Sequence, residues 1–567
     1  MRKASLIMLI LLLLSVPSIQ SDSYGGTLKM GFTTPIETLD PHRINIFYDD
    51  FDSSIAVVSQ IFEGLVSYAE GTAEIQPLLA ESWDISDDGL VYTFHLRGGV
   101  FWQDGNDIFP EGESREVTSE DFCFAWDRVM TPRILSPMRE FFEKTAKIQS
   151  WKANGRKIFE VTLSQPNPAF LYVLPFPCFS VVPREIDEMY GMDMFSAHTV
   201  GTGPFQLKTW SDALVLSYNE DYWGGEPYLS EITYTIHSSQ DLASAFENTS
   251  IDVCIIPAEV WDTFDQDRIV TVPRLEIVYI GMNCQKPPLT DPRVRQALNF
   301  TLDPEDSIAK IHGKKAVEAV SLLPPGLVCS RETIPEHDRY ARNIDKARLL
   351  LEEAGYTSHP RFTLQLLSFE SHVQQQFNEI YREQLREIDV ELEIEYVDFG
   401  SLLSRVDKGE TQLFTLGWYV DWPYPDQFLL LFHSSNWGPG GNGSFYMNKE
   451  VDSLLKEAGS ATDIQVACQL YQQAEEKILE DAPWILQWHR TEGYAVQEWV
   501  NEFSPGGMGD KYLQLKSVWI SSDHRQTTRI PPEPKPGGRN MFPFIIGGGI
   551  LTVIVILIIT ILRKKMR

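Results

Sequence analysis

Hydrophobic and polar residues alternate along several short stretches of the chain, a pattern typical of half-buried β-strands. Tyr92, Phe94 and Leu96 fall on one face of such a strand. The dipeptide Asp88-Gly89 precedes them, and Asp-Gly is a favoured turn between two antiparallel strands. Residues 82–97 are therefore predicted to form a β-hairpin. Further strands are expected at 26–31, 205–207, 214–218, 232–236 and 275–280.

Helical periods begin to alternate with strands after Leu289. Asp291-Pro292 and Asp303-Pro304 each place a capping aspartate before a proline, which is a common helix start. The alternation that follows is helix 345–354, strand 362–367, helix 373–388 and strand 390–396. It predicts an α/β domain. Nearer the N-terminus, a helix is expected over 57–65, closing near Gly64.

The stretch 416–426 concentrates rings and carboxylates in one short segment. It contains Trp418, Tyr419, Trp422 and Tyr424, together with Asp421 and Asp426. Two prolines stiffen it, and the run before it, 412–416, is expected to be a buried strand. A stiff aromatic loop at the end of a strand suits a cleft that holds a small solute. The other interpretation, with the rings in the core and the acids at the surface, stays open at this point.

The bulk composition narrows the class of protein and its partners. With 567 residues, of which 43% are hydrophobic, the chain exceeds the size at which one core stops growing, so two or three domains are expected. The formal net charge of −31 argues against nucleic acid and against anionic membrane surfaces as partners. A negative charge of this size does not identify a ligand.

Two apolar segments indicate the location of the protein. Residues 1–23 combine basic, apolar and then small polar residues, which is the pattern of a secretory signal peptide. Residues 541–562 are almost wholly apolar and long enough to span a bilayer, and the basic tail 563–567 follows them. The basic tail predicts a cytoplasmic C-terminus. A proline-rich stalk, 522–540, is expected to separate this single membrane span from an extracytoplasmic globule at the cell surface or in the periplasm.

Signatures of catalysis and of metal binding are missing from the sequence. There is no HExxH, GxSxG or Walker A motif, and the six cysteines form no CxxC pair. The run 438–443 matches GxGxxG, but it follows Asn436-Trp437 rather than a strand and contains a proline, so a flexible loop is expected. We expect no enzyme activity, no cofactor and no metal. Cys123, within an apolar run, is expected in the core.

Ordered motifs along the chain resemble the family 5 solute-binding proteins of ABC transporters, the peptide- and nickel-binding class. The resemblance begins with Leu39-Asp40-Pro41 and with the run from Ile61 to Leu65. It continues through 75–83, 86–97, 119–122, 203–205, Asn283, 291–297, Asp303, 347–355 and 417–421. Together these motifs extend over nearly the whole chain from the end of the signal peptide to about Ser521.

The resemblance implies an α/β fold of the periplasmic-binding-protein type II, with three domains in two lobes. A ligand would be trapped in the cleft as the lobes close, and the closed protein would dock on a membrane permease driven by a separate ATPase. The implied boundaries are domain I at 24–60, 200–280 and 490–521, inserted domain II at 61–199, and α/β domain III at 281–489.

The family's peptide binders place an aspartate after Gly-Trp-x-x to pair with the α-ammonium of the peptide. Here that pattern is Gly417-Trp418-Tyr419-Val420-Asp421, which implies that Asp421 binds the amine. The resemblance leaves Asp426, beyond that position, as a structural residue. Trp418, Tyr419, Trp422 and Tyr424 are expected to line the ligand pocket, although one or two of these rings can belong to the core.

One departure from the family pattern leaves the identity of the ligand open. The family's strict dipeptide binders carry an arginine just after the strand equivalent to 362–367, and residues 368–373 contain none. This absence favours longer or different ligands. The alternatives are an oligosaccharide-binding protein of the same fold and a surface sensor that binds without transport. Nickel and haem are disfavoured as ligands, because the sequence has no cluster of histidines near the loop. Asn248, Asn299 and Asn442 each begin an Asn-x-Ser/Thr triplet that permits glycosylation.

Overall fold

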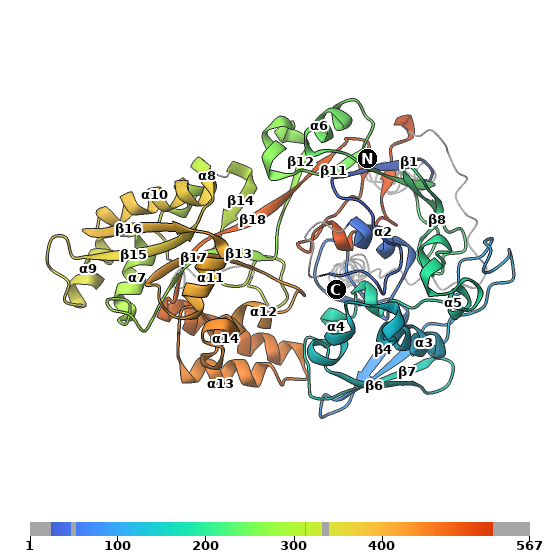
Figure 1. Cartoon of the computed structure of the whole chain (residues 1–567), viewed down its shortest axis with the longest axis horizontal. Helices are drawn as coiled ribbons and strands as arrows, with labels where there is room; N and C mark the ends of the chain where they lie inside the picture. The colour runs from blue at the N-terminus through green and yellow to red at the C-terminus, as the bar shows by residue number, and fades with distance from the viewer. Residues whose placement is uncertain (1–23, 47–52, 312, 332–339, 525–567) are drawn as a thin grey trace, which may run out of the picture. The chain divides into compact units, whose positions relative to one another are not determined.

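One long strand, β18 (Trp484–Val496), runs through the largest sheet of the protein and joins its two halves (Figure 1). The computed structural model describes residues 24–46, 53–311, 313–331 and 340–524. The beginning of β18 pairs antiparallel with β13 (Glu276–Met282), and its end pairs antiparallel with β11 (Val253–Ile255). In sheet order, the twelve strands run β16-β15-β17-β13-β18-β11-β1-β10-β9-β8, with β12 and β14 also paired to β18.

We call the strands on the β11 side of β18 the N-terminal half of the sheet. Its central strand, β1, pairs parallel with both β10 and β11, and β10 continues antiparallel into β9 and β8. The bounds of the remaining strands in this half are β1 (Thr27–Phe32), β8 (Phe205–Trp210), β9 (Leu214–Tyr218), β10 (Glu231–Ile236) and β12 (Ile269–Pro273). Helix α6 (Ser239–Glu247) packs beside β11.

We call the strands on the β13 side of β18 the α/β half of the sheet. Side chains alternate between its two faces, so Val278 and Ile280 join one core cluster while Ile277 and Tyr279 join another. The strands are β14 (Ala316–Glu318), β15 (Phe362–Phe369), β16 (Val390–Val397) and β17 (Leu413–Tyr419). β15 is parallel to both β16 and β17. The parallel pairs surrounded by helices agree with the predicted α/β region.

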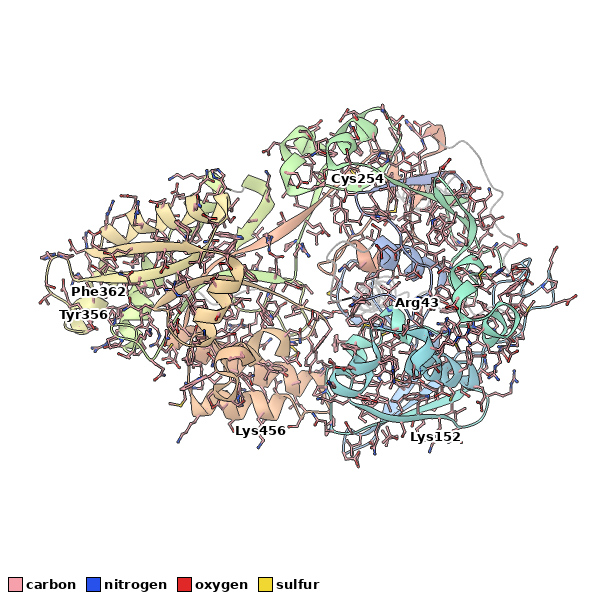
Figure 2. All side chains as sticks on the ribbon, in the orientation of Figure 1. Arg43, Lys152, Cys254, Tyr356, Phe362 and Lys456 are labelled. Carbon is pink, nitrogen blue, oxygen red and sulfur yellow. A yellow bond between two sulfur atoms is a disulfide. The ribbon has the colours of Figure 1, made fainter. Side chains whose placement is uncertain are left out.

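Two groups of helices cover the two faces of the α/β half. Residues of one core cluster come from α7 (Pro292–Thr301), α8 (Pro304–Ile311), α9 (Ile344–Glu353) and α10 (His372–Arg386). The other cluster draws on α11 (Phe399–Asp407), α12 (Asp426–Leu429), α13 (Lys449–Ala458) and α14 (Ile464–Asp481). At the outer end of this half, the rings of Tyr356 and Phe362 meet edge to face at 4.9 Å (Figure 2).

A separate four-stranded antiparallel sheet lies between α2 and β8 in the sequence. Its order is β4-β5-β7-β6, from β4 (Ala80–Ile85), β5 (Val91–Leu96), β6 (Ile148–Ala153) and β7 (Ile158–Leu163). The predicted hairpin is confirmed: β4 and β5 pair, and the Gly89 N–H donates to the Ser86 carbonyl at 2.8 Å. Gly89 has a φ of 69°, which an L-residue adopts only with strain.

The remaining elements complete the N-terminal part of the chain and its C-terminal return. The helices are α2 (Ser53–Ile61), α3 (Ser119–Met130), α4 (Phe170–Val173) and α5 (Arg184–Tyr190). The short strand pairs are β2 (Val66–Tyr68) with β3 (Ile75–Pro77), and β19 (Val500–Asn501) with β20 (Trp519–Ile520). The predicted helix at 57–65 is displaced, since α2 has ended before Gly64 and the chain then turns into β2.

Two further details correct the sequence analysis. The helical period of the predicted helix 373–388 places Val373 on the same face as Phe377, but Val373 is 38% exposed because it lies in the first turn of α10. Cys123 is only half-buried, although it packs against the main core. In addition, Cys329 and Cys468 form a disulfide that ties the segment before α9 to α14.

The aspartate of the motif Leu39-Asp40-Pro41 takes part in a buried ion pair. Arg128 on α3 donates to both carboxylate oxygens of Asp40, at 2.9 and 2.8 Å, and also to Asp187 at 2.9 Å. His42 belongs to the same cluster, because its Nδ1 lies 3.1 Å from the Arg128 guanidinium. Burial and the neighbouring arginine lower the pKa of His42 to about 4. This cluster fixes the start of the chain against α3.

No helix of the described residues is long and apolar enough to cross a membrane. The predicted signal peptide (1–23), the predicted span (541–562), the basic tail (563–567) and the stalk beyond residue 524 lie outside the described residues. The predicted domain boundaries stay a prediction.

Candidate functional site

The aromatic loop singled out from the sequence leaves the sheet at the end of β17. The strand begins buried, at Leu413, and emerges at its end, where Trp418 is 37% exposed and Tyr419 is 51% exposed. Tyr419 is the register partner of Glu276, the first residue of β13. The loop then turns back through Asp421, whose backbone N–H donates to Gln427 Oε1 at 3.2 Å. The exposed end of β17 thus presents two rings and a carboxylate to solvent.

The second half of the loop points into the protein. Tyr424 is 1% exposed, and its ring lies 5.1 Å from Tyr172 and 5.8 Å from Tyr471. Trp422 is half-buried and its ring lies 6.0 Å from that of Phe141. Tyr172 in α4 and Phe141, which precedes β6, both belong to residues 61–199, the segment expected to form inserted domain II. Trp422 and Tyr424 are therefore packing residues in this structure, while Trp418, Tyr419 and Asp421 are accessible.

A pocket opens beside Tyr419 and Asp421. Its other walls come from the start of β13 and the preceding turn, from Ile46, and from the C-terminal return of the chain. The full lining is Ile46, Arg274, Leu275, Glu276, Tyr419, Val420, Asp421, Gly507, Met508, Lys511 and Tyr512. We call it the β17 pocket. Of the five residues predicted to bind ligand, it includes Tyr419 and Asp421; Trp418, Trp422 and Tyr424 are not part of its wall.

The wall of the β17 pocket carries both signs of charge. Glu276 is buried, and its carboxylate is paired with Arg490 and, at 3.6 Å, with Arg274. Arg274 and Lys511 bring positive charges to the wall, and Asp421 brings a second carboxylate. Mixed charge of this kind, next to exposed rings, suits a zwitterionic or polar solute better than an apolar one.

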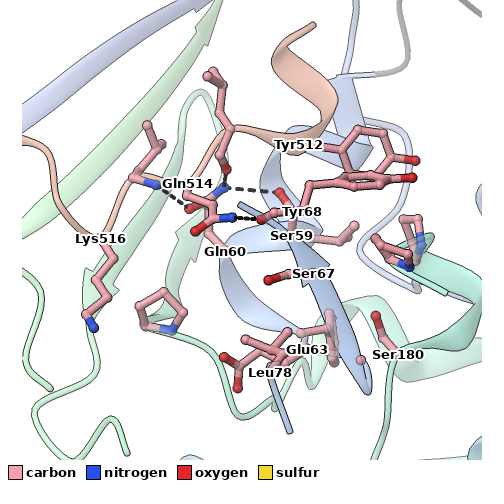
Figure 3. Close-up of a pocket in the computed structure, with 18 of the residues that line it drawn as sticks. Ser59, Gln60, Glu63, Ser67, Tyr68, Leu78, Ser180, Tyr512, Gln514 and Lys516 are labelled. Carbon is pink, nitrogen blue, oxygen red and sulfur yellow. Dashed lines mark hydrogen bonds between the residues drawn. The ribbon is translucent and has the colours of Figure 1, made fainter. Parts of the chain in front are cut away.

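A second pocket, shown in Figure 3, shares Tyr512 with the lining of the β17 pocket. Its walls are α2, β2 and the segment 512–516. Gln60 holds this segment by donating to the Leu513 carbonyl at 2.7 Å and accepting from the Leu515 N–H at 3.3 Å. Gln514 in turn donates to the Tyr68 carbonyl. The C-terminal return is thereby fixed where it can form a wall of each pocket.

Glu63 is a buried carboxylate in the wall of the second pocket. Its two oxygens accept hydrogen bonds from the Thr202 hydroxyl at 2.7 Å, the Tyr222 hydroxyl at 2.7 Å and the Trp223 indole at 2.9 Å. Burial nevertheless raises the pKa of Glu63 to about 7. The donors hold the side chain among elements far apart in the sequence, so this member of the motif from Ile61 to Leu65 joins α2 to the region around β8.

Asp426, the other carboxylate of the loop, is half-buried at the start of α12, with its Oδ1 shielded from solvent. Burial raises its pKa to about 7, and its Oδ1 has no hydrogen-bond partner among the described residues. Because it faces packed rings rather than the β17 pocket, it is not positioned like Asp421. No group of three or more histidine, cysteine, aspartate or glutamate side chains in the described part of the chain could hold a metal ion.

Sequence reasoning missed the pocket residues that are remote from the loop. Arg274 and Glu276 precede and begin a strand that was predicted, but nothing in their spacing marked them as part of a site. Lys511 and Tyr512 belong to a single 3₁₀ turn (Asp510–Tyr512), which no sequence motif marks. Only the sheet register, which places β13 beside β17, and the return of the C-terminus bring these residues to Asp421.

Comparison with known proteins places the chain in a family. Residues 74–440 match the family model described as "Bacterial extracellular solute-binding proteins, family 5 Middle". The chain is 27% identical over 492 residues to a dipeptide-binding protein of Escherichia coli (strain K12), covering 81% of this chain and 89% of that protein. It is 31% identical over 465 residues to the glutathione-binding protein GsiB of Salmonella typhimurium, covering 79% and 86%.

The fold agrees with this assignment. The structure of HbpA2 from Haemophilus parasuis superposes with a TM-score of 0.78 at 25% identity, covering 87% of this chain and all of that one. The mixed α/β, multi-domain architecture is that of the type II periplasmic binding proteins, as the motifs along the chain predicted. The protein is a member of the family 5 extracellular solute-binding proteins.

Proposed function

We propose that this protein is the peptide-binding component of an ABC importer, held outside the cell membrane by its C-terminal segment. The observation that carries the proposal is the position of Asp421 in the wall of the β17 pocket, beside the exposed ring of Tyr419. A carboxylate on the rim of a cleft becomes costly when a ligand excludes water, unless a cation pairs with it. A peptide α-ammonium supplies that cation, and the named ligands of two relatives, a dipeptide and glutathione, both carry one.

The exposed rings and the cations complete the proposed recognition. Trp418 and Tyr419 present apolar surface to ligand side chains. In the proposal, Lys511 and Arg274, which also pairs with Glu276, interact with carboxylates of a short peptide, since no arginine follows β15. In the proposal, Trp422 and Tyr424 do not contact the ligand but hold the loop in position by packing against Phe141 and Tyr172.

The domain arrangement expected from the sequence supplies the closing movement. In the proposal, domain III (281–489) moves against domains I and II, with β18 as one of the connections between the lobes. The pairing of β18 with both β13 and β11 supports this role. A separate permease and ATPase would complete the importer, since the chain carries no Walker A motif and we expect it to have no enzyme activity.

The membrane attachment rests on the sequence. The apolar run 541–562 and the basic tail 563–567 would form a single span with a cytoplasmic C-terminus, after removal of the signal peptide 1–23. The stalk 522–540 would hold the binding protein near the permease.

Calorimetry with three ligand pools tests the proposal: free peptides of two to five residues, the same peptides N-acetylated, and oligosaccharides. We expect binding of the free peptides and a loss of about 2 kcal/mol or more, at least ~30-fold in Kd, on acetylation. Asp421→Asn should produce a loss of similar size and should abolish the effect of acetylation. The control Asp212→Asn, in the exposed β8–β9 turn, should leave affinity unchanged.

Two outcomes would overturn the assignment. Equal affinity of Asp421→Asn and the unaltered protein for free peptides would remove the amine contact. Binding of oligosaccharides alone would favour the second candidate function, a sugar-binding protein, for which the exposed rings of Trp418 and Tyr419 offer flat surfaces. A binding protein that supports no peptide uptake when paired with its permease would indicate a sensor.

A further inference from the structure

The three Asn-x-Ser/Thr triplets of the chain differ in their exposure to solvent and in the hydrogen bonds of their asparagine side chains. Asn299 lies within helix α7, and Asn442 lies in the loop that precedes α13. Asn248 follows the last residue of helix α6 and forms its C-terminal cap. The chain belongs to a family of extracellular proteins, so all three triplets would meet the same modifying enzymes during or after export.

The side chain of Asn299 is committed to the interior. It is 4% exposed, and its Nδ2 donates to the carbonyl oxygens of Arg295 and Trp484, both at 3.1 Å. A sugar on this nitrogen would remove both hydrogen bonds and would have to fit between α7 and β18. The folded protein therefore excludes modification at this position.

Asn442 is committed in the same way. It is fully buried, and its Nδ2 donates to the carbonyl oxygens of His433 at 3.2 Å and Tyr446 at 3.0 Å. Its Oδ1 accepts the N–H of Tyr446 at 3.2 Å. The side chain thus organises the whole turn from 433 to 446, which leaves neither access nor a free nitrogen for a sugar.

Asn248 is arranged in the opposite manner. The residue is exposed, and its Oδ1 accepts the backbone N–H of Ser250 at 3.0 Å and the Ser250 hydroxyl at 2.5 Å. Its Nδ2 makes no hydrogen bond to any residue that the structure describes. The hydrogen bonds of the turn thus engage the amide oxygen, while the exposed side chain leaves the amide nitrogen available for reaction.

The surrounding turn is stable enough to present this geometry. The Asn248 N–H is bonded to the Ser244 carbonyl, Thr249 adopts a φ of 62°, and Lys29 Nζ donates to the Thr249 carbonyl at 3.1 Å. The hydroxyl of Ser250 and the amide of Asn248, which are the two groups that define the triplet, consequently lie side by side on the surface.

We propose that Asn248 is an N-glycosylation site of this protein, and that it alone of the three triplets carries a glycan in the folded state. In the reaction, Asn248 Nδ2 attacks the anomeric carbon of an oligosaccharide linked to a polyprenyl phosphate or pyrophosphate. The new N–C bond forms as the C–O bond to the phosphate breaks, the lipid phosphate leaves, and a base of the transferase takes the amide proton. The donor is thus a lipid-linked oligosaccharide.

The glycan would lie apart from the ligand site. None of the residues that line the β17 pocket belongs to α6 or to the turn after it. Modification should therefore leave peptide affinity unchanged, and the proposal stands or falls independently of the proposed function.

Mass spectrometry of the full-length protein, purified from the organism that makes it, tests the proposal. Proteolysis and tandem spectra searched without a preset glycan mass should reveal a saccharide mass on the peptide with Asn248, and unmodified peptides for Asn299 and Asn442. An unmodified Asn248 peptide, or a saccharide on Asn299 or Asn442, would overturn the proposal.

Variants expressed in the same organism separate modification from folding. Asn248→Asp keeps the acceptor oxygen of the turn but removes the nitrogen, and it should abolish the added mass. Ser250→Ala should abolish it as well, whereas Ser250→Thr, which restores the hydroxyl, should retain it. The exposed Asn154→Gln, outside any triplet, is the matched control and should leave the glycan in place. Retention of the saccharide in Asn248→Asp or in Ser250→Ala would contradict the assignment.

Discussion

At the scale of single residues, buried charged groups explain why several motifs of this chain contain acids. Asp40 is held by Arg128, Glu63 by three neutral donors, and Glu276 by Arg490 and Arg274. In each case at least one partner comes from a distant part of the sequence, so each acid takes part in a tertiary contact. Removing one partner leaves a charge or a polar group in an environment from which water is excluded.

Replacing Arg128 by methionine should destabilise the protein strongly. The substitution retains much of the side-chain volume but leaves Asp40 buried without its cation, which costs about 3–5 kcal/mol in comparable cases. Denaturant unfolding followed by intrinsic fluorescence measures the loss. Arg133→Met is the matched control, because Arg133 is 72% exposed and lies 4.0 Å from Asp193, so less than about 1 kcal/mol should be lost. Equal effects of the two variants would contradict the role of the buried pair.

Glu63→Gln should change how stability depends on pH. The pKa of Glu63 rises from 4.5 to about 7 on folding, so the unaltered protein loses stability from this group as the pH rises from about 4.5 to 7. Glutamine cannot titrate, and the variant should therefore gain stability relative to the unaltered protein over that window, by at most about 3 kcal/mol. Urea unfolding at pH 5 and pH 7.5 gives the difference, and a difference independent of pH would refute the assignment.

At the scale of elements, much of the secondary structure follows from the sequence, but the binding loop follows only in part. The alternation of Tyr92, Phe94 and Leu96 predicted β5, and the aspartate–proline pairs predicted α7 and α8. The rings of the loop carry no such period. Whether a ring faces the pocket or the core depends on what lies behind the loop, and Tyr172 and Phe141 lie there. For this reason the sequence could mark the loop but could not separate Tyr419 from Tyr424.

Reduction of the disulfide in the α/β half should lower the free energy of unfolding of the protein. Cys329 and Cys468 are 139 residues apart in the sequence, so the bond restricts the unfolded chain considerably. Replacing both by alanine should reduce the free energy of unfolding by about 2–5 kcal/mol and lower Tm. Cys123→Ala, at a free and half-buried thiol, is the control. The prediction fails if the melting temperature of the unaltered protein is the same with and without a reductant.

At the scale of the whole molecule, the candidate site is assembled from four separate segments of the chain. The β17 pocket takes Ile46 from the start, Arg274 to Glu276 and Tyr419 to Asp421 from the middle, and Gly507 to Tyr512 from the C-terminal return. A sequence can identify one of these parts through a motif, as it did for Asp421. It cannot identify the others, because sheet register and chain return, rather than local pattern, place them together.

Small-angle scattering should detect the closing movement that the proposed function requires. Addition of the peptide pool to the soluble portion of the chain should reduce the radius of gyration, since the proposed lobes close on the ligand. Asp421→Asn at the same peptide concentration should remain at the larger value. An unchanged radius in the unaltered protein, despite calorimetric binding, would argue against a hinged capture of peptide.

The position of β18 has a consequence for the biogenesis of the protein. Residues 484–496 are the seam between β13 and β11, yet they are among the last of the described residues to be synthesised. The two halves of the sheet can be joined only when this strand has been synthesised. The assembly of the chain into one sheet is therefore a late event of its folding.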